Sequence, residues 1–279
     1  MSDGSVLGLI AGSGLLPVLI ADGARRAGRR LAVVGLRGLA DPVLRDKADV
    51  FGWAGIARLG RWIRLLQAAG ARQAVLAGAV RKAEIYTPLR LLRYLPDWRT
   101  AWLWYVRLRH DRRDNAVLLA VADELAKEGI ELMSSIEFIP EHLASEGVMT
   151  RTQPGALCRG DAEWGFRIAR SSADLDIGQA LAVKERDIIA VEAMEGTAAM
   201  IERAGRLCRS GGWTLIKVAR PNQDPRFDVP TVGAETIRQL RAARAACLVL
   251  EAGKTLILDK PATLALADEL GIAVVGLRA

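Results

Sequence analysis

The sequence predicts an α/β fold made of two α/β domains joined by a linker. Short apolar runs typical of buried strands alternate with stretches of helical spacing along the whole chain. Residues 149–165 lack periodicity and are rich in Thr, Pro and Gly, which is typical of a boundary between domains. We therefore expect an N-terminal domain over residues 1–148, a linker over 149–165, and a C-terminal domain over 166–279.

The first half begins with a strand–helix–strand–helix–strand pattern. Apolar runs at residues 6–11, 31–36 and 73–76 predict the strands, and residues 15–27 and 56–69 between them have helical spacing. This order predicts a Rossmann-like domain with a parallel sheet covered by helices. Ligands of such sheets bind beyond the carboxyl ends of the strands, where we expect the turns at Gly12 and Gly78.

The turn Gly12-Ser13-Gly14 separates the first strand from the first helix. Backbone amides at a helix N-terminus suit a phosphate group, but a tight structural turn explains the glycines equally well. The dinucleotide fingerprint is incomplete, because Pro17 stands where it needs its third glycine and the second strand ends in Leu36-Arg37 without an acidic residue. A nicotinamide dinucleotide is therefore disfavoured, whereas a single nucleotide is not.

Residues 89–109 combine aromatic and basic side chains. Seven arginines lie from Arg90 to Arg113, with Trp and Tyr among them. This composition suits a membrane interface or stacking on single-stranded nucleic acid, and equally a helix whose aromatic side chains pack into the core. A helix that Asp114 or Asn115 could cap follows and ends at Lys127, and residues 130–133 predict a strand.

The second half alternates in the same way. The predicted strands are residues 188–191, 213–218, 247–250, 256–258 and 272–276, and the predicted helices are 163–171, 198–209, 234–243 and 261–270. The run Gly253-Lys254-Thr255 resembles the end of a P-loop, but Leu248 stands where the motif needs glycine. A strand is also predicted after it, where a P-loop requires a helix, so we expect no P-loop.

Three polar blocks occupy turns of the second half, at or close to the ends of strand-like runs. They are Asp176-Ile177-Gly178-Gln179, Glu192-Ala193-Met194-Glu195-Gly196-Thr197 and Gln223-Asp224-Pro225-Arg226-Phe227-Asp228. Acidic side chains at strand ends supply the oxygen ligands that magnesium takes beside water and substrate phosphates. Each block alone is also explained as a surface turn, a helix cap or an ion pair with Lys217. Their occurrence together in one domain favours a site.

Composition limits the classes of function. The chain has 279 residues, 51% of them hydrophobic, which is ample for a packed core, and no apolar run reaches the ~20 residues that span a bilayer. The N-terminus lacks the basic lead of a secretory signal, so we expect a cytoplasmic protein. Three cysteines without a C-x-x-C pair and two histidines disfavour a disulfide framework, a zinc site and a Ser-His-Asp triad. The net charge of +7 favours an anionic partner.

Six segments, at residues 9–17, 76–80, 114–116, 176–179, 192–197 and 217–230, carry a resemblance over essentially the whole chain. Together they resemble the LpxI-type UDP-2,3-diacylglucosamine pyrophosphatases of lipid A biosynthesis. The second and third polar blocks are specific in combination, whereas the Gly-Ser-Gly turn alone is not. Asn115 departs from the family pattern, which usually has a second acid beside Asp114, so a metal role for position 115 is in doubt.

The resemblance implies a magnesium-dependent hydrolase of Gram-negative lipid A biosynthesis. It would convert UDP-2,3-diacylglucosamine to UMP and 2,3-diacylglucosamine 1-phosphate (lipid X), by water attack on the sugar-side phosphorus. Together with the chemistry of the residues, it implies four catalytic residues: Asp224, Glu195, Lys217 and Arg226. The implied magnesium ligands are Asp224, Glu195 and Asp228, with Glu192 as a further candidate.

The other residues of the expected site would bind the substrate through backbone amides and polar side chains. They are Ala11, Gly12, Ser13, Gly14, Gly78, Ala79, Asp114, Asn115, Gly178, Gln179, Glu192, Gly196, Thr197 and Gln223.

The implied partners are the lipid substrate and the lipid X product, and no nucleic acid. Residues 89–109 are a candidate contact with the cytoplasmic face of the inner membrane, or a contact between subunits of a homodimer. Two other classes of function stay open at this point. One is a nucleotide-sugar transferase or reductase, and the other is a non-catalytic membrane or nucleic-acid binding module.

Overall fold

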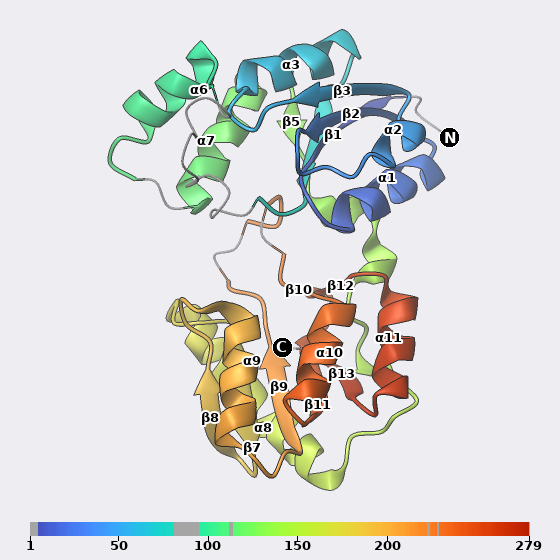
Figure 1. Cartoon of the computed structure of the whole chain (residues 1–279), viewed down its shortest axis with the longest axis vertical. Coiled ribbons are helices and arrows are strands. Elements are labelled where there is room, and N and C mark those ends of the chain that lie inside the picture. Colours follow the sequence, from blue (N-terminus) through green and yellow to red (C-terminus); the bar gives the residue numbers. More distant parts are fainter. Residues whose placement is uncertain (1–4, 81–94, 112–113, 222–223, 228, 279) are drawn as a thin grey trace. The chain divides into compact units, whose positions relative to one another are not determined.

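The computed structural model describes residues 5–80, 95–111, 114–221, 224–227 and 229–278, and its contacts divide the chain into two compact units (Figure 1). The N-terminal unit extends to Ile139 and includes Pro225–Phe227. The C-terminal unit contains Pro140–Asp224 and the described residues from 229 onward. The first change from one unit to the other therefore lies between Ile139 and Pro140. Residues 149–165, where we expected a linker, belong to the C-terminal unit.

A five-stranded parallel sheet forms the centre of the N-terminal unit, in the order β3-β2-β1-β4-β5. This confirms the predicted Rossmann-like parallel sheet. One edge strand, β3, was not predicted, because Gly52 interrupts its short apolar run. The strands are β1 (Val6–Ala11), β2 (Arg30–Leu36), β3 (Val50–Ala54), β4 (Gln73–Ala77) and β5 (Glu131–Leu132).

Helices connect and cover these strands (Figure 1). Helix α1 has Pro17 in its first turn, where the missing N–H is tolerated. It packs tightly on the segment after β5, since a Cβ added at Gly23 would lie 1.9 Å from the carbonyl oxygen of Phe138. The helical segments are α1 (Leu16–Arg26), α2 (Leu44–Lys47), α3 (Leu59–Ala68), α6 (Trp98–Trp102), a π-helical turn (Leu103–Arg107), α7 (Asp114–Lys127) and a 3₁₀ turn (Ser135–Phe138).

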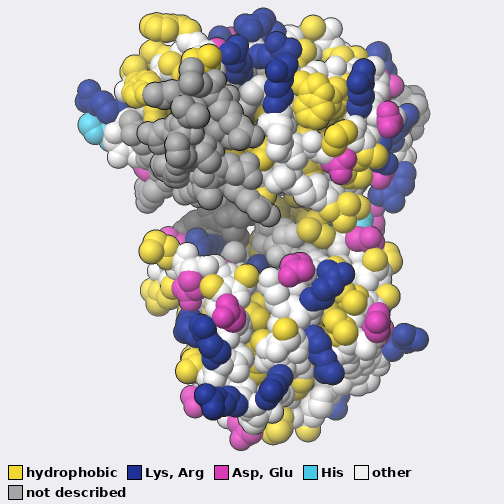
Figure 2. All heavy atoms as spheres, in the orientation of Figure 1, with side chains coloured by type: hydrophobic (Ala, Val, Ile, Leu, Met, Phe, Trp, Pro, Cys, Tyr) yellow, Lys and Arg dark blue, Asp and Glu magenta, His cyan; other side chains and the backbone are white. Residues whose placement is uncertain are grey.

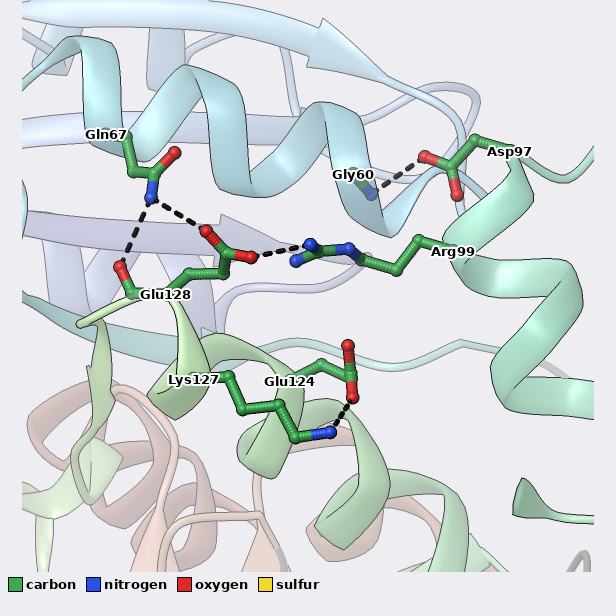
Figure 3. A network of polar contacts seen from close by, with 7 residues as sticks. All are labelled: Gly60, Gln67, Asp97, Arg99, Glu124, Lys127 and Glu128. Carbon is green, nitrogen blue, oxygen red and sulfur yellow. Dashed lines mark hydrogen bonds and ion pairs between the residues drawn. The ribbon is translucent and has the colours of Figure 1, made fainter. Parts of the chain in front are cut away.

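A polar network joins α3, α6 and α7 (Figure 3). Asp97 caps the N-terminus of α6 and also accepts the N–H of Gly60 from α3 at 2.7 Å. Glu128, just beyond α7, pairs with Arg99 of α6 at 2.5 Å and accepts a hydrogen bond from Gln67 of α3 at 3.2 Å. These contacts fix the short helix α6 against its two neighbours.

The C-terminal unit is built on a six-stranded mixed sheet in the order β6-β13-β11-β9-β7-β8. Strands β9, β11 and β13 are parallel, whereas β7 is antiparallel to β8 and β9, and β6 to β13. A small parallel sheet pairs β10 with β12. Strand β12 follows Thr255 directly, which confirms the strand expected after the Gly-Lys-Thr run. The strands are β6 (Gly147–Val148), β7 (Ala180–Lys184), β8 (Asp187–Val191), β9 (Trp213–Lys217), β10 (Thr231–Val232), β11 (Ala245–Glu251), β12 (Leu256–Ile257) and β13 (Ala273–Leu277).

Both faces of the central strands are covered, and every residue of β9 is buried. Along β9, Ile216 packs with Phe166 of α8 (Ala156–Asp174) on one face. Leu215 packs on the other face with Ile201 of α9 and Leu240 of α10. The helices of that second face are α9 (Gly196–Leu207), α10 (Ala234–Ala242) and α11 (Lys260–Glu269).

Four elements of the C-terminal unit differ from the prediction, and two of them are the unpredicted two-residue strands β6 and β10. Helix α8 begins at Ala156, inside the expected linker, and β7 forms an unpredicted hairpin with β8. The hairpin turn places Glu185 (φ 54°) and Arg186 (φ 62°) in the left-handed region that usually requires Gly or Asn. The carboxylate of Asp161, on α8, accepts their N–H groups at 3.1 and 2.7 Å. Because this support comes from another element, no local residue type marks the turn.

Candidate active site

The carboxyl ends of β8, β9 and β11 meet at one edge of the C-terminal sheet, called here the carboxyl edge. Lys217, the last residue of β9, pairs with Leu250 of β11 on one side and with Ala180 of β7 on the other. On its far side β7 pairs with β8, which ends at Val191. Glu192, after β8, and Glu251, the last residue of β11, therefore emerge at the same edge as Lys217. This is the edge at which ligands of open α/β sheets bind.

Hydrogen bonds join three side chains at this edge, called here the Glu192 cluster. Lys217 Nζ donates to Thr197 Oγ1 at 3.2 Å, and Thr197 Oγ1 donates to Glu192 Oε1 at 2.8 Å. Lys217 also donates to the carbonyl oxygen of Thr231 at 3.2 Å. Glu192 and Lys217 are only 6% and 7% exposed. The cluster thus holds a cation and a carboxylate in a desolvated place, where charge interactions are stronger than in water.

One carboxylate oxygen of Glu192 has no hydrogen-bond partner among the described residues. This oxygen, Oε2, is buried. An unsatisfied buried acceptor destabilises the folded state by about 1–3 kcal/mol, and more for a charged group. Such an atom suits a ligand hydroxyl or a water that donates a hydrogen bond, or a cation that the oxygen would coordinate.

The first polar block packs directly behind this cluster. A Cβ added at Gly178 would lie 1.8 Å from the carbonyl oxygen of Glu192, so glycine is required there by the close approach of two backbones. The carbonyl of Gln179 accepts the N–H of Val218 at 2.9 Å, immediately after Lys217. The first block thus holds the backbones beside Glu192 and Lys217.

Glu195 lies apart from the cluster, at the N-cap position of α9 before Gly196 (φ 81°). Its carboxylate pairs with Arg203 and accepts the N–H of Ala193 at 3.2 Å. The hydrogen bond from Arg203, followed by the backbone amides, holds the pKa of Glu195 below its usual range. Because this exposed carboxylate is already engaged, binding a metal would require it to exchange Arg203 for the ion.

The third polar block is divided between the two units. Asp224 belongs to the C-terminal unit and Pro225–Phe227 to the N-terminal unit, where Ser134 Oγ donates to the Pro225 carbonyl at 2.9 Å. Asp224 and Arg226 are both partly buried. The two other residues predicted from this block lie outside the described residues: Gln223 and Asp228.

In the N-terminal unit, the predicted turn after β1 packs on the turn after β4. The N–H of Gly12 donates to Ala77 O at 2.8 Å, and Ser13 and Ala79 exchange backbone hydrogen bonds of 3.1 and 2.9 Å. Ser13 Oγ donates to Ala79 O at 2.7 Å. A Cβ at Gly78 (φ 93°) would lie 2.7 Å from Ser13 O. The amides of Gly12, Ser13 and Ala79 are therefore used inside the unit.

The backbone amides that remain for a ligand are those of residues 14–16, at the N-terminus of α1. In the described part of the chain, the backbone N–H groups of Gly14, Leu15 and Leu16 donate no hydrogen bond, and the N-cap residue Leu15 has no polar side chain that could bind them. Ala11, the last residue of β1, is buried beneath this turn. Free amides at a helix N-terminus attract a phosphate group, so the phosphate prediction now rests on residues 14–16.

Both halves of the chain match domains of one family. Residues 6–142 match the LpxI N-terminal domain, and residues 145–275 match the LpxI C-terminal domain. The chain belongs to the LpxI family. It is 37% identical over 284 residues to the UDP-2,3-diacylglucosamine pyrophosphatase LpxI of Caulobacter vibrioides, covering 97% of this chain and 96% of that relative. The two matched LpxI domains meet close to the point where the contacts divide the chain.

Two other residues predicted to bind substrate, Asp114 and Asn115, lie in the first turn of α7. Their side chains lie outside the described part of the structure, so their predicted contact with substrate stays a prediction.

A magnesium ion held by the described residues would need further ligands from the substrate and from water. Within the described residues, no three His, Cys, Asp or Glu side chains gather in a metal-binding arrangement. Magnesium needs only one or two carboxylates when phosphates and water complete its octahedron. Asp224, partly buried, and Glu192, with its unpartnered Oε2, are described carboxylates that suit this mode.

Glu251, the last residue of β11, was not among the residues predicted from the sequence. It is 1% exposed at the carboxyl edge, and its Oε2 accepts the N–H of Ala219 at 2.9 Å. In the sequence it precedes Gly253-Lys254-Thr255 and resembles an ordinary turn acid. Its place at the end of an otherwise apolar strand is the pattern that could have identified it.

Proposed function

We propose that this protein hydrolyses the pyrophosphate bond of UDP-2,3-diacylglucosamine in lipid A biosynthesis. The Caulobacter vibrioides relative is named for this reaction, and the match over both LpxI domains supports the same activity here. The structural observation that supports it best is the buried Glu192 cluster, a cation and an incompletely bonded carboxylate at the carboxyl edge. These findings favour a hydrolase over the transferase, reductase and binding-module alternatives.

In the proposed reaction, a water oxygen forms a bond to the sugar-side phosphorus. The bond from that phosphorus to the bridging oxygen breaks, and UMP leaves with the bridging oxygen. The proton of the water passes to a base or to solvent, and 2,3-diacylglucosamine 1-phosphate is the second product. The protein must therefore orient the water and offset negative charge on the phosphoryl and leaving oxygens.

We assign these tasks to the described residues as follows. Lys217 offsets the charge that develops on the bridging oxygen, and Thr197 fixes the position of its ammonium group. Asp224 orients the attacking water or binds the metal ion, and Arg226 neutralises terminal phosphoryl oxygens. The amides of residues 14–16 bind a phosphate of the nucleotide, and Gln179 orients the sugar.

Magnesium would neutralise the diphosphate oxygens, with Asp224 as its first protein ligand. Glu192, Glu195 and Asp228 are the further candidates. Glu195 must first give up Arg203, whereas Glu192 Oε2 has no described partner to lose.

The proposed reaction is tested by incubating the purified protein with UDP-2,3-diacylglucosamine and magnesium in ¹⁸O-labelled water. We expect UMP and lipid X, with the label in the phosphate of lipid X. Label in UMP would overturn the attack on the sugar-side phosphorus. Absence of both products would overturn the proposed function.

The role of Asp224 is tested by Asp224→Ala in the same assay. We expect UMP release to fall about 100-fold or more, because the water or the metal ion loses its positioning carboxylate. Near-normal turnover by the folded variant would overturn the assignment of Asp224.

We further propose that the N-terminal unit contacts an anionic membrane surface on the cytoplasmic side. The contact is the aromatic surface of α6 and the π-helical turn, formed by Trp98, Trp102, Trp104, Tyr105 and Val106, of which Trp98 is 85% exposed. Figure 2 shows hydrophobic side chains on the surface of this unit with Lys and Arg nearby. Aromatic rings suit the headgroup region, and the net charge of +7 favours anionic lipids. The described helices include none with the length and apolarity to cross a bilayer.

Cosedimentation with phosphatidylglycerol vesicles tests this contact. The double variant Trp98→Ala/Tyr105→Ala should bind several-fold less than the unmodified protein, and kcat on detergent-solubilised substrate should stay unchanged. Equal binding by both proteins would overturn the membrane contact. If the unmodified protein sediments as a dimer and the variant as a monomer, the aromatic surface is instead a subunit interface.

A further inference from the structure

The carboxylate of Glu251 makes three contacts at the carboxyl edge. Its Oε2 accepts the N–H of Ala219 at 2.9 Å, and its Oε1 lies 2.8 Å from Lys254 Nζ and 3.3 Å from the Arg170 guanidinium. Burial alone would raise the pKa of Glu251, but Lys254, the Ala219 amide and Arg170 outweigh it, so the pKa lies below its usual range. A buried carboxylate with this set of donors stays ionised and accepts strong hydrogen bonds.

Ala219 belongs to the segment that joins two residues of the proposed site. It lies between Lys217 of the Glu192 cluster and Asp224 of the third polar block. Its neighbour Val218 still continues the sheet pattern, because its N–H donates to the Gln179 carbonyl at 2.9 Å. Ala219 is therefore the first residue after β9 whose amide is bound by a side chain instead of a backbone carbonyl.

We infer that Glu251 is a positioning residue of the proposed hydrolase. By accepting the Ala219 N–H, it fixes the direction in which the chain leaves Lys217. Glu251 acts through this backbone and does not touch the substrate. The inference rests on the proposed function, since it concerns the alignment of the groups that carry out the hydrolysis.

Two neighbouring cations allow an ionised carboxylate to be buried at position 251. Lys254 and Arg170 are partly exposed cations that neutralise the buried charge through Oε1, which leaves Oε2 to accept the Ala219 N–H. An ionised acceptor binds an N–H about twice as strongly as a neutral one. A neutral amide at position 251 should hold the Ala219 N–H less firmly.

The same unit contains a matched control. Asp161 is equally buried at 1% exposure, and its two oxygens accept the N–H groups of Glu185 and Arg186 in the β7–β8 turn. Strands β7 and β9 are antiparallel, so Lys184 at the end of β7 lies near the start of β9. The β7–β8 turn follows Lys184 and lies at that same end of the sheet. Asp161 therefore holds a turn as Glu251 does, but at the edge opposite Lys217.

The experiment compares Glu251→Ala, Glu251→Gln and Asp161→Ala in the full chain. For Glu251→Ala we expect kcat to fall about 10- to 100-fold with KM within about 3-fold, because misplacement of reacting groups acts on the chemical step. For Glu251→Gln, which keeps an acceptor oxygen, kcat should fall about 3- to 10-fold. Asp161→Ala should lose stability and keep kcat within about 2-fold.

Amide hydrogen exchange supplies a readout that does not depend on activity. Glu251→Ala should accelerate exchange at Ala219 and leave Arg186 unchanged, and Asp161→Ala should do the reverse. If Glu251→Ala fails to fold, Glu251→Gln carries the same comparison. A kcat for the folded Glu251 variants equal to that of Asp161→Ala, or unchanged exchange at Ala219, would overturn the inference.

The two possible failures are distinguishable. If the unmodified protein releases no UMP, the proposed function fails, whereas hydrogen exchange still decides whether Glu251 fixes Ala219. If the unmodified protein is active and the Glu251 variants match it, only the positioning role fails.

Discussion

The two edges of the six-stranded sheet in the C-terminal unit both hold buried carboxylates, and they use them differently. At the amino edge of β9, both oxygens of Asp161 accept backbone N–H groups of the adjacent turn. At the carboxyl edge, Glu251 accepts one backbone N–H and pairs with two cations. Glu192, at this same edge, keeps an oxygen that no described residue bonds.

This difference in hydrogen bonding indicates which edge serves the stability of the fold and which serves its function. A buried carboxylate whose bonding capacity is filled by the backbone stabilises one conformation of the chain. A buried carboxylate with an unused oxygen destabilises the fold by about 1–3 kcal/mol or more, and natural proteins accept such a loss at binding and catalytic sites. The amino edge is therefore interpreted as structural and the carboxyl edge as the site of chemistry.

The largest expected effect is that of Lys217→Met at the carboxyl edge. Methionine nearly matches the length of lysine but cannot offset negative charge, so kcat for UMP release should fall about 100- to 1000-fold. Steady-state kinetics measures this, with urea unfolding as the control for folding. A fall below about 10-fold would break the assignment of chemistry to this edge.

Thr197→Val should have the next largest effect. It removes the hydroxyl that joins Lys217 to Glu192, and a loss of one hydrogen bond predicts a fall in kcat of about 10-fold, or about 1.4 kcal/mol. Thr197→Ser keeps the hydroxyl and should stay within about 2-fold of the unmodified protein. Equal rates for the two variants would show that the hydroxyl plays no part.

The dependence of stability on pH distinguishes Glu251 from a neutral acceptor. Because the pKa of Glu251 is lowered in the folded state, its ionised form adds stability above the unfolded pKa of about 4.3. That stability is lost as pH falls through the lower folded pKa. The free energy of unfolding of the unmodified protein should therefore exceed that of Glu251→Gln most at neutral pH, with the difference shrinking in acid. Urea unfolding from pH 7 to pH 3 measures this, and a constant difference would contradict it.

Glu195→Gln is expected to have the smallest effect. Its exposed carboxylate is bound by Arg203 outside the Glu192 cluster, and an exposed ion pair contributes little, so kcat should change less than about 3-fold. Titration of activity with magnesium adds the decisive control. A several-fold rise in the magnesium concentration needed for half-maximal activity would instead identify Glu195 as a ligand.

Periodicity and turn residues are enough to predict much of the fold. Apolar runs located β1, β2 and β4, and the parallel sheet followed from their alternation with helices. The edge strand β3 and the hairpin strand β7 were missed. Gly52 interrupts the first, and the turn after the second depends on Asp161, 24 residues upstream of Glu185.

The candidate site divides in the same way. The sequence by itself determined the family and the three polar blocks, because these are local patterns of residue types. Only the tertiary structure brought Glu192, Thr197 and Lys217 together and engaged Glu195 with Arg203. It alone identified Glu251, whose partner Ala219 lies 32 residues away. Burial and hydrogen bonding between distant elements decide what a carboxylate does, and neither is written in its neighbours along the chain.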